Sequence, residues 1–313
     1  MRKGILQIVV LVFILSCSRA GFTEAPKLNV VTTIFPPYDF TREIAGDCVN
    51  LKMLLPPGAE SHSYEPTPRD IIMIQDCDVF IYSGGQADVW IERILASIDG
   101  DGIALLPMIE LVDAVEEAIV EGMEEEYADE EEEDGGEIEL DEHVWTSPQN
   151  AKLIAQRIAD TLSALDPSRA EIFRNNMAIF AAALDDLDVQ FRQVIDAAAR
   201  TTVVFGDRFP FRYFADAYGL EYYAAFPGCA TETEASAATI RFLIDKVRDE
   251  GIPVVFEIEL SNGKIADAVA ESAGAKKLSM HSVHNLTKDD FDAGLGYLSL
   301  MRRNAEVLKE ALN

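Results

Sequence analysis

The chain has 313 residues, and 49% of them are hydrophobic, which is enough for two domains that each bury a core. The formal net charge of −29 disfavours nucleic acid and anionic membrane surfaces as partners and favours cations. Much of this charge lies in residues 116–142, which contain no Lys or Arg and predict a solvated acidic insertion.

The first residues predict export from the cytoplasm. Arg2 and Lys3 precede an apolar run over 5–15 that is too short to span a bilayer, so we assign residues 1–16 to a signal peptide. The run ends in Leu15-Ser16-Cys17, which resembles the lipobox of bacterial lipoproteins and implies a lipid anchor at Cys17. A plain signal peptide with later cleavage is the alternative. We therefore expect an extracytoplasmic, membrane-anchored lipoprotein in the periplasm or at the cell surface.

Short apolar runs alternate with helical patterns and predict two α/β lobes, at 17–165 and 201–313, each built on a parallel sheet. The expected strands are 28–34, 50–55, 79–82 and 103–106 in the first lobe and 201–205, 221–225, 254–258 and 276–280 in the second. The expected helices are 38–45, 68–77, 87–98, 210–218, 235–250 and 263–273, with a long final helix over 289–312.

Residues 166–200 predict one long, rigid helix that joins the lobes. Asp166 suits the cap, Pro167 suits the first helical position, and apolar residues then recur at helical spacing without another Gly or Pro. A ligand site is expected between the lobes, because ligands of open α/β sheets bind beyond the carboxyl ends of the strands.

Three cysteines follow Cys17. Cys48 and Cys77 each precede a strand of the same expected sheet, so they could pair as a disulfide and leave Cys229 as a free thiol.

The chain has four histidines, His62, His143, His281 and His284, and none lies in a helical pattern. A single histidine in a loop is usually an exposed polar residue. The first three, however, are expected to converge on the cleft between the lobes, where neutral imidazoles bind transition metals. We expect His284, one step further from the strand end, to contribute much less.

Three groups of residues resemble successive motifs of the zinc and manganese solute-binding proteins of bacterial ABC transporters. They are Gly-Ala-Glu-Ser-His-Ser-Tyr-Glu-Pro-Thr-Pro over 58–68, Asp-Glu-His-Val-Trp over 141–145, and Phe-Arg-Tyr-Phe with Tyr-Gly-Leu over 211–220. The match extends over nearly the whole mature chain. The resemblance implies two α/β lobes, a long connecting helix and one divalent metal ion between the lobes. It also implies delivery of that metal to an ABC permease, and a transport role rather than an enzymatic one.

Carried over by position, the resemblance implies that His62 and His143 are the first two ligands and His281 the last, with Glu257 as an acid near the site. Three imidazoles and one carboxylate suit Zn²⁺ in a four-coordinate site, and Mn²⁺ comes second because it prefers more oxygen ligands.

The third ligand position departs from the family pattern, because it holds Arg208, which has no lone pair to donate. Asp207 is the nearest donor and completes the predicted ligand set. A role for Asp207 as the salt-bridge partner of Arg208 is equally open, and Cys229 and Glu232 are other replacements.

Two other functions compete with metal transport. A secreted zinc metallohydrolase could use the same histidines, but the sequence has no His-Glu-x-x-His run, nucleophile elbow or phosphate loop. A surface adhesin that has lost metal binding is the third possibility, since the like charge of Arg208 weakens cation binding.

Overall fold

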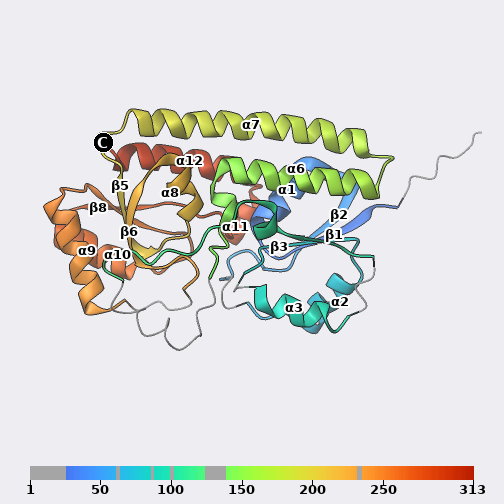
Figure 1. Ribbon diagram of the computed structural model, residues 1–313, viewed down its shortest axis with the longest axis horizontal. Helices are drawn as coiled ribbons and strands as arrows, with labels where there is room; N and C mark the ends of the chain where they lie inside the picture. The colour runs from blue at the N-terminus through green and yellow to red at the C-terminus, as the bar shows by residue number, and fades with distance from the viewer. Residues whose placement is uncertain (1–25, 61–63, 86–87, 99–101, 124–138, 231–234) are drawn as a thin grey trace, which may run out of the picture.

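The computed structural model describes residues 26–60, 64–85, 88–98, 102–123, 139–230 and 235–313. It is an α/β protein with two four-stranded parallel sheets that lie side by side under a long helix (Figure 1). The first sheet contains β1 (Leu28–Thr32), β2 (Val49–Met53), β3 (Val79–Tyr82) and β4 (Ala104–Pro107). The second contains β5 (Thr202–Arg208), β6 (Glu221–Phe226), β7 (Val254–Glu257) and β8 (Lys276–Ser279). All eight expected strands are present, with boundaries that differ by up to three residues.

The two sheets have the same strand order, β2-β1-β3-β4 and β6-β5-β7-β8, which confirms the predicted repeat of one plan. In each sheet the chain moves outward by one strand and then returns to the far side of the first strand. This reversal of direction lies at the carboxyl ends of β1 and β3, and of β5 and β7, where open α/β sheets bind ligands.

Helices cover the sheets as the alternating pattern predicts. Their bounds are α1 (Phe35–Ala45), α2 (Pro68–Gln75), α3 (Val89–Leu95), α6 (Pro148–Leu165), α7 (Ala170–Asp196), α8 (Arg212–Tyr218), α9 (Ala237–Asp249), α10 (Lys264–Ala273), α11 (Lys288–Asp292) and α12 (Tyr297–Ala311). Short 3₁₀ turns are η1 (Gly46–Cys48), η3 (Met108–Leu111) and η4 (Val144–Thr146). None of the helices in the described ranges has the length and apolar character to cross a membrane.

The long helix is present as α7, but it begins at Ala170 rather than at Asp166. Asp166 instead follows the end of α6, and its Oδ1 accepts hydrogen bonds from the backbone N–H of Ser168 at 3.1 Å and from the Ser168 hydroxyl at 2.5 Å. Pro167 lies in this turn. The expected elements do not include α6, which packs along α7. The 27 residues of α7 extend about 40 Å at 1.5 Å per residue, enough to pass both sheets (Figure 1).

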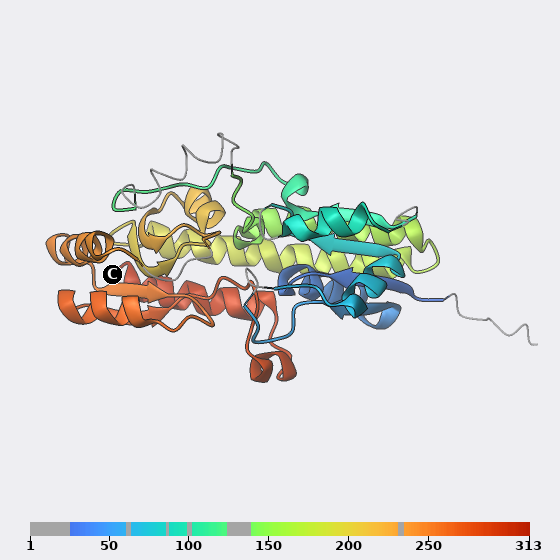
Figure 2. The same cartoon turned by 90° about the horizontal axis from the view of Figure 1, so that it is seen from below.

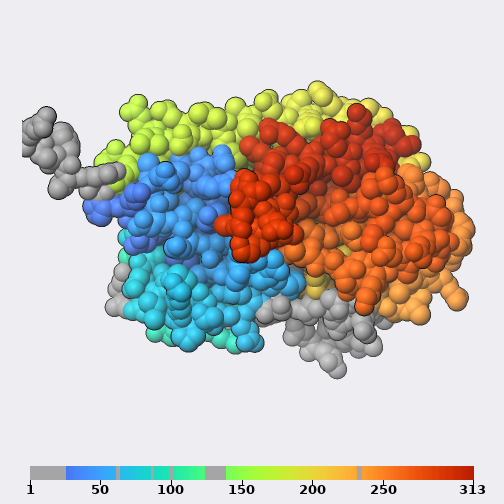
Figure 3. Space-filling view, turned by 180° about the vertical axis from the view of Figure 1, so that it is seen from behind, coloured from blue at the N-terminus to red at the C-terminus, as the bar shows by residue number. Residues whose placement is uncertain are grey.

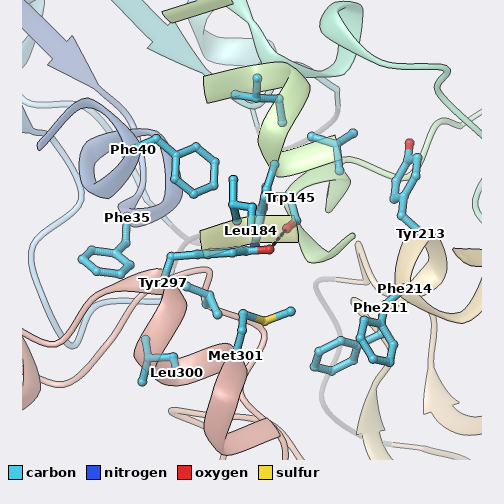
Figure 4. Packing of buried hydrophobic residues seen from close by; sticks show 14 of the residues in the cluster. Phe35, Phe40, Trp145, Leu184, Phe211, Tyr213, Phe214, Tyr297, Leu300 and Met301 are labelled. Atoms are coloured by element: carbon cyan, nitrogen blue, oxygen red, sulfur yellow. Dashed lines mark hydrogen bonds between the residues drawn. The ribbon is translucent and has the colours of Figure 1, made fainter. Parts of the chain in front are cut away.

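The expected final helix is broken into α11 and α12. The break contains Gly294 in a left-handed conformation, with φ of 74°, and α12 restarts where Oδ2 of Asp39 accepts the backbone N–H of Tyr297 at 2.6 Å. Tyr297 is fully buried, and its hydroxyl donates to the carbonyl oxygen of Trp145 at 2.8 Å (Figure 4). This bond joins the C-terminal helix to the segment that follows His143.

The space-filling view shows the C-terminal helices packed across the junction of the two lobes (Figure 3). Helix α12 also packs along α7, so both helices contact the region where the lobes meet. The lobes are therefore joined by more than one segment of the chain.

The expected disulfide is wrong, because Cys48, Cys77 and Cys229 are all free thiols. Cys48 precedes β2 and Cys77 precedes β3, but β1 lies between these strands. Two strand spacings amount to roughly 9–10 Å, beyond the roughly 7 Å that a disulfide can bridge between Cα atoms.

Candidate metal site between the two sheets

A cavity of about 50 Å³ lies at the carboxyl ends of the second sheet. Arg208 at the end of β5, Glu259 after β7 and His284 after β8 line it from this sheet. Glu60, from the segment after β2, and His143, at the start of η4, complete the wall. The cavity therefore lies where the strand order predicts a ligand, between the two lobes.

The imidazoles of His143 and His284 lie close together on this wall. Their ring centroids are 5.3 Å apart and the rings are nearly perpendicular, at 84°. Trp145 packs against both, at 5.5 Å from His143 and 5.0 Å from His284, and its indole N–H donates to the carbonyl oxygen of Ser282 at 2.8 Å. Because all these side chains are buried, Trp145 fixes the two histidines relative to each other.

A carboxylate orients the ring of His143, which is fully buried. Oδ1 of Asp141 accepts the backbone N–H of His143 at 2.8 Å and lies 3.1 Å from its Nδ1. Burial opposes a charge on His143, but the carboxylates of Asp141, Glu142 and Glu117 outweigh this effect and raise the pKa of His143. Histidines that bind metals usually have their second nitrogen oriented in this way.

The chain that carries His143 packs on the second lobe, although its position in the sequence assigns it to the first. Residues 112–123 run from η3 toward the elements of the second sheet (Figure 2). The hydroxyl of Tyr213 accepts the N–H of Val115 at 3.2 Å and donates to the carbonyl oxygen of Asp141 at 2.7 Å. Oε1 of Glu117 accepts the N–H of Cys229 at 2.7 Å. These bonds hold both sides of the acidic insertion, and with them His143, against the second sheet.

His284 lines the cavity, and His281, the histidine predicted from sequence, does not. The side-chain amide of Asn304 forms two hydrogen bonds with the backbone of His281. Its oxygen accepts the His281 N–H at 2.8 Å, and its NH₂ group donates to the His281 carbonyl oxygen at 2.7 Å. Nδ1 of His281 accepts the N–H of Val283 at 2.9 Å within its own loop. Val283 has a φ of 64°, rare for a β-branched residue, and this turn points His284 to the cavity. A ligand role for His281 stays a prediction.

Asp207 does not line the cavity. Its Oδ1 accepts the N–H of Arg208 at 2.9 Å and its Oδ2 lies 3.4 Å from the N–H of Ile258, so the carboxylate connects β5 to the loop after β7. Burial raises the pKa of Asp207 despite these bonds. The side chain of Arg208, in contrast, lines the cavity. Its Nε donates to the carbonyl oxygen of Ala230 at 2.5 Å, and its Nη1 lies 3.7 Å from Oε1 of Glu60. A ligand role for Asp207 stays a prediction. Its contacts favour a role in positioning the backbone at Arg208 and Ile258.

Glu259 is the acid near the site, in place of Glu257. Glu257 forms an ion pair with Lys277 at 2.9 Å, away from the cavity. The carboxylate of Glu259 accepts the N–H and the hydroxyl of Ser282, both at 2.6 Å, and the N–H of His284 at 3.2 Å. The sequence signal for Glu259 is weak, because it is only an acid two residues beyond a strand.

The other proposed replacements have different outcomes. Gly228 lines the cavity, but the neighbouring Cys229 does not. Burial and then the carboxylates of Glu142 and Glu117 raise the pKa of the Cys229 thiol well above its usual value, which disfavours the thiolate that binds metals. His62 and Glu232 lie outside the described residues, as does Cys17. Among the residues that are described, no three His, Cys, Asp or Glu side chains form a group that could hold a metal ion.

The fold and this cavity define a class of protein. Two parallel sheets of the same topology face one small cavity with their loops, and paired imidazoles form part of its wall. This is the architecture of a two-lobed binding protein whose ligand lies between the lobes.

The chain belongs to the ZnuA family, described as zinc-uptake complex component A, periplasmic, and the family match covers residues 30–311. It is 33% identical over 291 residues to the high-affinity zinc uptake system protein ZnuA of Bacillus subtilis, covering 93% of this chain and 89% of that protein. It is 31% identical over 299 residues to the zinc-binding lipoprotein AdcA of Streptococcus pneumoniae, covering 95% of this chain but only 58% of that longer protein.

A solved structure supports the same relationship. The Zn(II)-bound ZnuA-like domain of Streptococcus pneumoniae AdcA superposes with a TM-score of 0.73 at 30% identity, covering 92% of this chain and 99% of that domain. The predicted α/β architecture with a long helix is therefore confirmed, and so is the predicted family.

Proposed function

We propose that this protein captures one zinc ion in the cavity between its lobes, with His143 and His284 as ligands. His62, matched to a ligand position by the family motif, is proposed as the third. His284 replaces the His281 of the sequence prediction, because it is the histidine of this loop that lines the cavity.

The observation that carries the proposal is the spacing of the two rings. With Zn–N distances of about 2.0–2.1 Å and tetrahedral geometry, two imidazoles on one zinc ion have centroids roughly 5 Å apart. The centroids of His143 and His284 are 5.3 Å apart without any rearrangement. This spacing supports a zinc ion shared by the two rings.

The charge around the cavity supports a cation despite Arg208. The guanidinium of Arg208 lies 3.7 Å from the carboxylate of Glu60, which partly offsets its charge. Glu259 lies on the wall, and Asp141 contacts His143. These carboxylates outnumber the single guanidinium at the cavity.

We further propose that the protein delivers zinc to an ABC permease from outside the cytoplasm, anchored by a lipid on Cys17. The family's description as a periplasmic component of zinc uptake supports the transport role. Manganese is the second candidate ion, and the nitrogen ligands argue for zinc over it. The family's description as a component of zinc uptake favours transport over the metallohydrolase.

The test is a zinc titration of the metal-free protein, followed by calorimetry and thermal unfolding. We expect one zinc ion per chain, a rise in the free energy of unfolding of about 4 kcal/mol at a thousandfold excess over Kd, and no hydrolysis of model esters or peptides. His143→Ala should remove most of that rise. A protein whose melting temperature does not respond to zinc would contradict the proposal.

A further inference from the structure

A second, smaller cavity of about 10 Å³ lies on the first-lobe side of His284. Thr33 follows β1 and Ser83 follows β3, so this cavity belongs to the carboxyl edge of the first sheet. Asp88 lies on the same wall. His284 lines both this cavity and the larger one, so its imidazole separates the proposed zinc site from the polar edge of the first sheet.

The small cavity has the properties of a site for one water molecule. Thr33 is 3% exposed, and its Oγ1 is buried without a hydrogen-bond partner among the described residues. Asp88 is 7% exposed, and its Oδ2 accepts the N–H of Gly84 at 3.1 Å. Buried polar groups nearly always have a protein or water partner, and an ordered water needs about 10–15 Å³ and two to four polar partners.

We propose that one ordered water molecule in this cavity connects Thr33 and Asp88 to the imidazole of His284, so that these two residues position His284 as a metal ligand. The inference rests on the proposed zinc function and adds a role for the first sheet to it. A histidine that binds a metal through one ring nitrogen usually donates its other N–H to a carboxylate, a carbonyl or water, and loss of that partner costs roughly 10–100-fold in metal affinity.

Two nearly isosteric variants test this role. Thr33→Val removes the hydroxyl and Asp88→Asn removes the charge, and each should weaken zinc binding about 10–100-fold. Each should also change the tautomer of His284 in the metal-free protein, measured by ¹⁵N NMR of its ring nitrogens. Asp88→Asn also removes a buried acid, so its thermal stability at pH 8 should rise while its zinc affinity falls. A purely structural role would lower both together.

Thr41→Val is the matched control for Thr33→Val. Thr41 is buried and donates to the carbonyl oxygen of Pro37 at 2.7 Å. It lines neither cavity. The control variant should keep the wild-type zinc affinity and His284 tautomer.

The outcomes separate this inference from the proposed function. If Thr33→Val and Asp88→Asn leave both the zinc affinity and the tautomer unchanged while His284→Ala loses zinc binding, the water-linked role is overturned and the function stands. If His143→Ala and His284→Ala also bind zinc like the wild type, the proposed function fails and this inference fails with it.

Discussion

The carboxyl edge of each sheet holds a carboxylate that lines a cavity with His284, the buried Asp88 on one and the partly buried Glu259 on the other, and their surroundings differ. Asp88, on the first edge, is buried with backbone amides as its partners, and burial raises its pKa to about 7. Glu259, on the second edge, accepts two bonds from Ser282 and one from His284, and lies 3.4 Å from His281.

This difference shows that the fold determines where the site lies, and that the loops determine the surroundings of each acid. The shared strand order brings both edges to His284, so topology decides where the site lies. The loop after β8 surrounds Glu259 with donors and makes it a structural clamp, whereas the loop after β3 leaves Asp88 poorly solvated. The loops after the equivalent strands β3 and β7 therefore hold carboxylates in different surroundings: burial raises the pKa of Asp88, and Glu259 accepts bonds from Ser282 and His284.

The largest effect expected from this comparison is on the pH dependence of stability. Folding raises the pKa of Asp88 from its ordinary value of 3.8 to about 7, so the folded protein binds the proton more tightly than the unfolded chain does. The contribution of Asp88 to stability must then fall as pH rises from about 4 to 7, by about 4 kcal/mol at 1.4 kcal/mol per unit. Asp88→Asn should lack this component and exceed the wild type in stability at pH 8, but not at pH 4. Denaturant unfolding of the metal-free proteins at both pH values measures it, and an equal difference at the two pH values would refute it.

Glu259→Gln should give the next largest effect, in the opposite direction. The amide has one acceptor oxygen, so its NH₂ group would face the donors of Ser282 and His284. Hydrogen bonds to a charged group contribute about 1.5–3 kcal/mol each, and we expect a loss of about 2–3 kcal/mol in the free energy of unfolding, with weaker zinc binding. Stability and zinc affinity like those of the wild type would mean that the loop after β8 holds its shape without this carboxylate.

Glu257→Gln should have the smallest effect and serves as the control for Glu259→Gln. Its carboxylate is 24% exposed and pairs with Lys277, which is 28% exposed, so the pair should contribute less than about 1 kcal/mol. Zinc affinity should not change. A loss of zinc binding in this variant would return Glu257 to the site, as the family resemblance suggests.

The strands can be predicted from sequence because each is a short apolar run between turn signals, as at Val79–Tyr82, which the structure reproduces without change. The prediction from sequence omits α6, although Ser147 caps this helix, Pro148 lies in its first turn, and its buried residues recur at helical spacing. The pairing of Cys48 with Cys77 can be excluded only with knowledge of the sheet order, which places β1 between their strands.

Part of the candidate site is also accessible from sequence. The motif around His143 places this histidine on the cavity wall, and the loop after β8 is recognisable as a source of a ligand. Which histidine of that loop faces the cavity depends on the left-handed turn at Val283 and on Asn304 of α12, contacts that no local pattern reveals. Glu259 escapes sequence reasoning for the same reason, since its partners lie 23 and 25 residues away.

The most direct test of the account is to compare the zinc affinities of His284→Ala and His281→Ala by calorimetry. Both remove one imidazole from the same loop. The account predicts that His284→Ala loses more than about 100-fold in affinity, beyond the range for removal of a supporting partner, whereas His281→Ala loses much less. A larger loss in His281→Ala, with His284→Ala close to the wild type, would contradict the site proposed here.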